Sequence, residues 1–310
     1  MKKKKIFKCK NANQNMTCFL SDHHEQEMGQ HPSQEAQERF LEFVTNLFLT
    51  HSGIDDFKID SSLERFSGLN SAEELNRYRD QVLYSDGLSQ VASVVEKVGS
   101  ALGGLSLVPH AVGLGALIIS LALDVVAKSL KKETLGTAEM VERVFAQEKA
   151  REVRDLMHEY LKRMQINLRN PRLQLSETRQ REIALSAQLT RLKNSMLIDG
   201  HIDPHLMKQW VNGAAFHTQM LIHQARLERR QERDGSRAMR AAGIYQQDLN
   251  RIVDKLMNMI TENDKSELCI KYVALLRSKP QISWTQDYFS KLQSNIPSLV
   301  RQNADFYIQT

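Results

Sequence analysis

The side chains best suited to binding a metal ion lie around residue 203. His201, Asp203 and His205 form a His-x-Asp-x-His pattern, which offers two imidazoles and a carboxylate. Pro204 directly follows Asp203, so this aspartate is also placed to cap a helix that begins with proline. No fourth ligand follows at the spacing of a familiar zinc site. The sequence therefore predicts no metal at this position.

Signatures of catalysis and of cofactor binding are absent from the sequence. It contains no GxxxxGK[ST] loop, no strand-linked GxGxxG, no GxSxG and no HExxH. Cys9, Cys18 and Cys269 are widely separated, which fits no disulfide framework and suits a reducing compartment. Cys269 lies in an apolar helical pattern, where a buried and inert thiol is expected. We therefore expect a non-enzymatic protein without a cofactor.

Six arginines near residue 230 recur mostly at steps of three or four. They are Arg226, Arg229, Arg230, Arg233, Arg237 and Arg240. A continuous helix would place them on one stripe, with acidic residues interleaved. A solvated, salt-bridged face is the common outcome of such a pattern. Contact with anionic lipid head groups is the second interpretation, and RNA or another acidic partner is the third.

One stretch of the chain carries no Lys, Arg, Asp or Glu, although these residues make up 25% of the whole. It extends from Val98 to Leu123 and holds Pro109 together with five of the 14 glycines. The membrane-segment residues that we select from it are aliphatic, apart from the proline. They are Leu105, Pro109, Val112, Leu114, Leu117, Ile118, Leu121 and Leu123. Such a stretch either enters a bilayer or lies at the centre of a helical bundle.

The length and composition of this stretch do not decide between these two outcomes. Its most apolar window, Leu105 to Leu123, holds ten Leu, Ile or Val residues, which together favour insertion by roughly 3–6 kcal/mol. A break at Pro109 would leave two arms that are each too short to span the ~30 Å hydrocarbon core. A single span, a membrane hairpin and a buried core hairpin thus stay open, with membrane contact preferred.

Length and composition indicate an all-α protein. The chain has 310 residues with only 6 prolines and 14 glycines, and β-branched or aromatic clusters bounded by turn residues are scarce. We expect an elongated bundle of long amphipathic helices around the glycine-rich apolar segment. The predicted helices cover about 33–50, 71–84, 88 onward, 111–127, 137–168, 176–197, 204–233, 237–261, 265–278 and a short one from 283.

Local signals set several of these boundaries. Ser71 and Glu74 have the spacing of a capping box that opens a helix. Asn170-Pro171 is interpreted as the end of one helix, and Pro280 as the end of another. The predicted units are a disordered, Lys-rich tail (1–32), a helical segment (33–97), the apolar segment (98–127) and a C-terminal bundle (128–310).

Charge is unevenly distributed over these units. The tail has six lysines against three acids, residues 33–97 have six basic and twelve acidic residues, and residues 124–310 have 30 basic and 22 acidic residues. The start of the chain lacks the apolar run of a signal peptide, so we expect a cytoplasmic protein that can associate with a membrane. Expected partners are membrane lipid, another protein or a second copy of the chain, whereas nucleic acid is not expected.

The arrangement of amphipathic helices around one glycine-rich, uncharged segment resembles apolipoprotein-L-like proteins and α-helical pore-forming proteins. The resemblance lies in the layout alone and transfers no functional residue. It implies a helical fold that associates with or inserts into membranes through residues 98–127. The alternative is a cytosolic helical-bundle scaffold that uses the same segment as its core.

Overall fold

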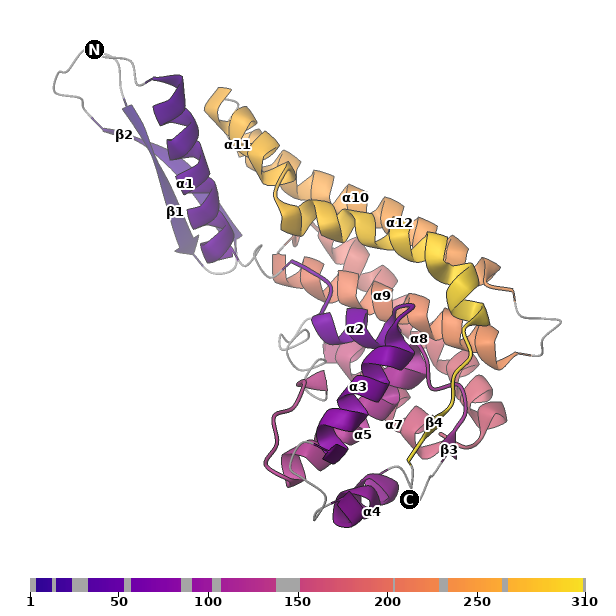
Figure 1. Cartoon of the computed structure of the whole chain (residues 1–310). Coiled ribbons are helices and arrows are strands. Elements are labelled where there is room, and N and C mark those ends of the chain that lie inside the picture. Colours follow the sequence, from indigo (N-terminus) through magenta and orange to yellow (C-terminus); the bar gives the residue numbers. More distant parts are fainter. Residues whose placement is uncertain are drawn as a thin grey trace.

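The structure is a computed structural model of the chain, and it describes residues 4–12, 15–23, 33–52, 57–84, 91–101, 107–137, 151–202, 204–228, 234–263 and 267–308. Helices make up most of these ranges (Figure 1), so the predicted all-α helical bundle is confirmed. The first half of the predicted helix 137–168 lies outside the described residues, because α7 is described as Arg151–Ile166.

The N-terminal region differs from the predicted disordered tail. Strands β1 (Lys4–Ala12) and β2 (Asn15–His23) pair antiparallel, with Lys4 opposite His23 and Ala12 opposite Asn15. Short β-prone runs around Ile6 and Phe19, separated by an Asn-rich segment, account for this hairpin. It lies beside α1 (Gln34–Ser52), away from the main bundle (Figure 1), and α1 contacts α11 (Glu267–Arg277).

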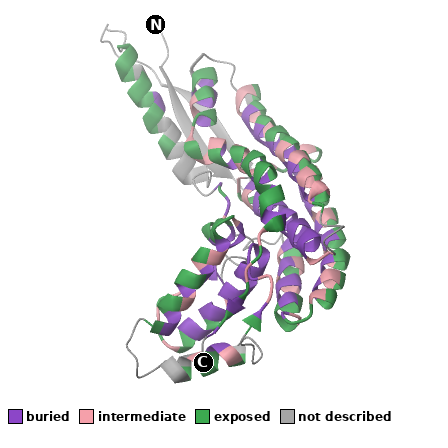
Figure 2. Cartoon of the chain, turned by 45° about the vertical axis from the view of Figure 1, so that its right-hand side comes forward, coloured by how far each residue is buried: buried purple, intermediate pink, exposed green. Residues whose placement is uncertain are grey.

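The apolar segment enters the centre of the N-terminal group of helices. This group comprises α2 (Ser61–Ser67), α3 (Ser71–Tyr84), α4 (Val91–Ala101) and α5 (Leu114–Ser129). The other three helices all pack against α5, which also touches α7 and α9 (Pro204–Leu227). Because α5 is covered by several neighbours, its side chains are buried on nearly every face (Figure 2).

A second buried helix, α9, organises the C-terminal group. It packs against α8 (Pro171–Leu197), α10 (Ser236–Asn263) and α12 (Pro280–Arg301), and α8 in turn packs against α7. Almost every residue of α9 from Leu206 to Arg226 is buried. The two groups share one continuous hydrophobic core.

Asn212 of α9 connects the two groups through the chain before α2. Its Oδ1 accepts from the backbone N–H of Asp60 at 2.7 Å, and its Nδ2 donates to the carbonyl of Lys58 at 2.9 Å. Thr285 of α12 donates to the carbonyl of Phe57 at 3.0 Å. These side chains satisfy backbone groups that would otherwise be buried without partners, so the segment is fixed in place.

Two prolines that the sequence analysis interpreted as helix ends are helix starts. Pro171 and Pro280 each occupy the first turn, of α8 and α12 respectively. Proline is well tolerated there, because a first-turn N–H has no partner within the helix. Asn170 caps α8 by accepting from the N–H of Leu173 at 3.1 Å.

Helix α3 begins at Ser71 as predicted, but the capping box from which this start was predicted does not form. The Ser71 hydroxyl accepts from the backbone N–H of Gly113 at 2.7 Å, so it joins α3 to the apolar segment. Glu74 pairs with Arg77 at 2.7 Å instead of closing a capping box.

Among the residues that the structure describes, no helix has both the length and the apolar composition needed to cross a bilayer.

A tight contact before α5 gives a test of this packing. A Cβ at Gly115 would lie 2.3 Å from the carbonyl oxygen of His110, a backbone atom that cannot rotate away. At Gly99 in α4, no atom of the described residues lies within 4 Å of a new Cβ. Gly115→Ala should therefore lower the free energy of unfolding by about 1–3 kcal/mol in urea denaturation.

Gly99→Ala is the matched control, and its higher helix propensity should raise stability by about 0.5–1 kcal/mol. Equal effects of the two substitutions on the free energy of unfolding would show that the carbonyl of His110 is not in tight contact with Gly115.

Candidate functional site

Most of the predicted membrane-segment residues lie in the protein interior. Leu114, Leu117, Ile118 and Leu123 are at most 1% exposed, and Val112 is fully buried. Leu121 and Pro109 are partly exposed, and Leu105 lies outside the described residues. Most of the described ones belong to one continuous helix, α5, and the turn before it.

The polar side of α5 is also enclosed. Tyr78 of α3 donates a hydrogen bond to the carboxylate of Asp124, and both residues are buried. Burial raises the pKa of the Tyr78 phenol, and the bond to Asp124 raises it further. The phenol therefore stays protonated and serves as a donor to the only acidic residue of α5.

Three parts of the chain hold the turn that precedes α5. The N–H of Ala111 donates to the carbonyl of Ala304 at 2.8 Å, and that of Gly113 donates to Ser71. From α9, Arg226 donates through Nη1 to the carbonyl of Val112 at 2.8 Å. These contacts come from α3, α9 and the segment after α12, so the start of α5 is fixed by distant parts of the sequence.

The turn itself adopts an uncommon backbone conformation. His110 has a φ of 61° and Gly113 a φ of 56°. Glycine accepts this region readily, but a histidine there is uncommon and requires support from its surroundings. The contacts of the neighbouring Ala111 and Val112 provide that support.

A short β-ribbon covers the outside of this turn. β3 (Leu107–Val108) pairs antiparallel with β4 (Phe306–Tyr307). Val108 and Phe306 face inward and are buried, whereas the cross-strand pair Leu107 and Tyr307 is about half exposed. The ribbon thus seals the core on one face and presents an apolar pair on the other.

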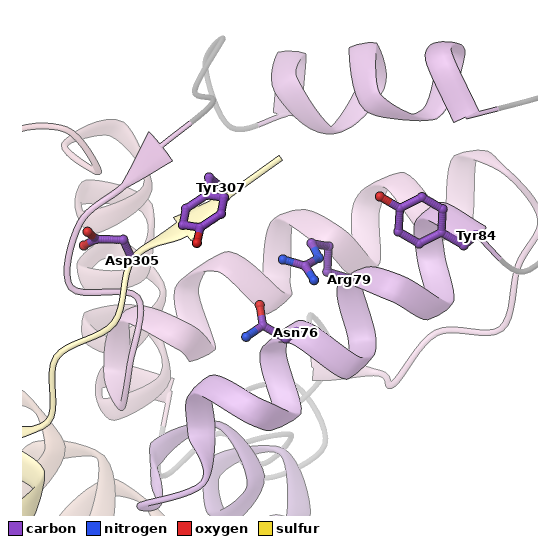
Figure 3. Close-up of a pocket in the computed structure, with 5 residues that line it drawn as sticks. All are labelled: Asn76, Arg79, Tyr84, Asp305 and Tyr307. Atoms are coloured by element: carbon purple, nitrogen blue, oxygen red, sulfur yellow. The ribbon is translucent and has the colours of Figure 1, made fainter. Parts of the chain in front are cut away.

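Tyr307 also lines a surface groove between α3 and the segment after α12. The groove has a volume of about 330 Å³, and its described lining consists of Asn76, Arg79, Tyr84, Asp305 and Tyr307 (Figure 3). Arg79 is held by Asp80, with both Nε and Nη2 at 2.8 Å from one carboxylate oxygen. The described lining contains no histidine, cysteine or serine, so it offers aromatic and hydrogen-bonding contacts rather than a nucleophile with its base.

The predicted arginine stripe is divided by the structure. Arg226 is 1% exposed and faces the interior, so it is not a surface contact. Arg237 binds Glu182 at 2.7 Å, and Arg240 is exposed. The helix that would align the six arginines ends at Leu227 and a new one begins at Ser236. The remaining members, Arg229, Arg230 and Arg233, lie outside the described residues.

A buried polar network joins α8, α9 and α10, and the sequence analysis missed it. His217 lies with Nε2 3.2 Å from Glu182 and Nδ1 2.9 Å from the hydroxyl of Tyr245. Burial favours a higher pKa for Glu182, but hydrogen bonds from His217 and Arg237 outweigh it, so the net pKa is lowered. His217, Glu182 and Tyr245 are each less than 9% exposed, which fits a connection between helices better than a reaction centre.

No local signal in the sequence could have identified this network. Its four members come from three helices, and each has the spacing of an ordinary amphipathic position. Only the tertiary packing of α8, α9 and α10 brings them together.

His223 of α9 is a second buried polar group near the turn. Its Nε2 lies 3.1 Å from the amide oxygen of Gln174. That amide donates to the carbonyls of Asn167 and Leu168, so the histidine must be the donor. Burial lowers the pKa of His223 to about 3, and the charges of Arg226 and His110 act in the same direction. The imidazole is therefore neutral at physiological pH.

Comparison of the chain with protein-family models, with curated proteins and with solved structures found no match in any of the three.

The buried position of Arg226 leads to a stability prediction. Arg226→Met keeps most of the side-chain volume but removes the donor to Val112, so a buried carbonyl loses a partner. The free energy of unfolding should fall by about 1–3 kcal/mol in urea denaturation. Arg240→Met, on the exposed side of α10, is the control and should change it by no more than about 0.5 kcal/mol. Equal results would contradict the assignment of Arg226 to the core.

His223 should make stability depend on pH. Its folded pKa of about 3 lies below the ordinary histidine value of 6.5, so the unfolded chain binds the proton first as pH falls. The contribution is complete above pH 6.5 and is lost as pH falls toward 3, at about 1.4 kcal/mol per pH unit.

Chemical denaturation between pH 6.5 and about 4.5 measures this slope. Carboxylates such as Glu182 begin to titrate at the lower end of this range, so the difference between the wild type and a variant isolates the histidine. His223→Gln should make the slope shallower by about 1.4 kcal/mol per pH unit. Parallel curves for the wild type and the variant would contradict the assignment.

Proposed function

We propose that the protein is a non-enzymatic helical-bundle scaffold of the cytoplasm, in which the apolar segment 98–127 is part of the folded core. The observation that carries this proposal is the burial of α5. Of its 16 residues, the only ones that are not buried are Leu121, Val125, Lys128 and Ser129. A helix that is covered on nearly every face by its own chain has no surface left for lipid.

The energetics of releasing α5 support the same interpretation. Its six large buried aliphatic side chains contribute roughly 9–18 kcal/mol to the folded state, at about 1.5–3 kcal/mol each. They are Leu114, Leu117, Ile118, Ile119, Leu123 and Val126. This amount is comparable with the total stability of a typical domain, about 5–15 kcal/mol. Removing α5 would therefore unfold its surroundings.

A bilayer would compensate for only part of this loss. It could solvate the side chains of α5, but not the helix faces that α5 leaves behind. The buried sides of α2 and α3 that pack against α5 would then face water, among them Tyr78, which binds Asp124 and is 2% exposed. Asp124 would also lose its bond to Tyr78 and would have to remain outside the hydrocarbon core or enter it at a cost.

The groove between α3 and the segment after α12 supports a role in partner binding. Tyr84 and Tyr307 are about half exposed beside Arg79. Tyrosine and arginine are the residue types that carry much of the binding energy in protein interfaces. The exposed aliphatic side chain of Leu107 lies opposite Tyr307 and extends this surface.

A charge placed inside or outside the core tests the proposal. Leu117→Asp combined with Ile118→Asp should abolish cooperative unfolding and reduce the helical circular dichroism signal, because two carboxylates cannot be buried there without partners. Val125→Asp is the control, since Val125 lies on the same helix but is 56% exposed. It should leave the fold intact.

The wild-type protein is tested in parallel by flotation with vesicles of phosphatidylcholine alone. We expect it to stay unbound, because α5 remains in the core. Wild-type binding to these neutral vesicles, together with a folded double variant that no longer binds, would contradict the proposal and favour membrane insertion of 98–127.

A further inference from the structure

The turn between α7 and α8 combines positive charge with exposed aliphatic side chains. From residue 160 to residue 176 the chain has four basic residues and no acidic one. All four are exposed: Lys162, Arg163, Arg169 and Arg172. We refer to residues 162–173 as the basic tip.

Two large aliphatic residues lie exposed within the basic tip. Ile166, in the last turn of α7, is 68% exposed, and Leu173, in the first turn of α8, is 49% exposed. Neither side chain contributes to the core, although both helices have well-defined buried faces. Exposed aliphatic residues at a helix connection that is otherwise basic indicate a contact surface.

The backbone of the basic tip is rigidly supported. Leu168 is 3% exposed and anchors the turn in the core. The Gln174 amide donates to the carbonyls of Asn167 and Leu168, both at 2.9 Å, and Asn170 caps α8. The tip is thus presented in one conformation, which reduces the entropy lost on binding.

Two carboxylates of the described residues lie beside the tip, and each pairs with an arginine. Glu159 binds Arg163 at 2.7 Å, and Glu177 binds Arg181 at 2.9 Å. Glu159 thus offsets Arg163, a member of the tip, and also lies near Lys162, whereas the partner of Glu177 lies outside the tip. Lys162 and Arg172 add further exposed positive charge to the tip.

We propose that the basic tip docks on the surface of an anionic lipid bilayer. Positive charge is attracted to the negative surface potential of such a membrane. Ile166 and Leu173 would enter the boundary between head groups and acyl chains, as the apolar side chains of peripheral membrane proteins do. These two residues favour a bilayer over nucleic acid, which offers phosphate charge but little apolar surface at its exterior. Because docking leaves α5 in place, it does not depend on the proposed scaffold role.

Binding of the full-length protein to vesicles of phosphatidylcholine, with and without phosphatidylserine, tests this surface. The wild type should bind only the anionic vesicles, and added salt should release it. The charge variant Lys162→Gln/Arg169→Gln/Arg172→Gln should weaken anionic binding at least about tenfold, while its thermal midpoint stays close to that of the wild type. The apolar variant Ile166→Ser/Leu173→Ser should weaken it several-fold.

Matched control variants lie on other helices. Arg240→Gln/Lys291→Gln/Arg301→Gln removes the same number of exposed charges, and Ile183→Ser/Ile244→Ser removes two isoleucines that are 66% and 56% exposed. Both controls should bind as the wild type does.

Three results would overturn the proposal. The first is equal binding to neutral and anionic vesicles, or binding that resists salt, either of which would indicate insertion of an apolar segment. The second is tip variants that bind as the wild type does. The third is salt-sensitive binding to RNA that is lost in the charge variant, together with unchanged vesicle binding in the apolar variant.

Discussion

The aliphatic side chains of α5 pack against α2, α3 and α4, and this contact positions most of what surrounds them. Residues that are far apart in the sequence meet around this helix: Ser71 and Arg226 hold the turn before it, and Tyr78 binds its one carboxylate. Apolar packing supplies the free energy, whereas the polar contacts select one arrangement, because a displaced helix would leave buried donors and acceptors unpaired. The composition that makes the segment compatible with a bilayer is thus also what a central helix requires.

The second central helix, α9, is more polar, and hydrogen bonds from its buried side chains help to hold it in place. Its buried polar side chains include His217 and His223, and each has a partner on α8. Asn212 extends the same principle to the backbone before α2. Through these contacts, α9 connects the N-terminal and C-terminal groups into one core. A substitution that destabilises α5 should therefore lower the stability of both groups.

The sequence was sufficient to predict the helical class and most helix boundaries, because periodic apolar residues and capping residues act locally. The prediction was wrong where one residue type is compatible with both the end and the start of a helix. Pro171 and Pro280 were interpreted as stops, although proline serves equally well in a first helical turn. The hairpin at residues 4–23 was missed because its β-prone runs are short and surrounded by lysine and asparagine.

The candidate site was less predictable than the fold. The sequence identified the residues of α5 but could not decide between lipid and protein as their surroundings, because both are apolar. Arg226 could not be distinguished from Arg240 by spacing, since a break in the helix between them changes the face that each presents. The groove at Tyr84 and Tyr307 depends on α3 meeting the segment after α12, a contact between residues more than 200 positions apart in the sequence.

Hydrogen exchange of the α5 backbone amides tests the central claim most directly. If α5 is the core, its amides beyond the first turn should exchange only through global unfolding, as slowly as those of α9, both in buffer and with neutral vesicles. Exchange of α5 by local opening, with protection gained only when vesicles are added, would contradict the account and show that the helix leaves the bundle for the membrane.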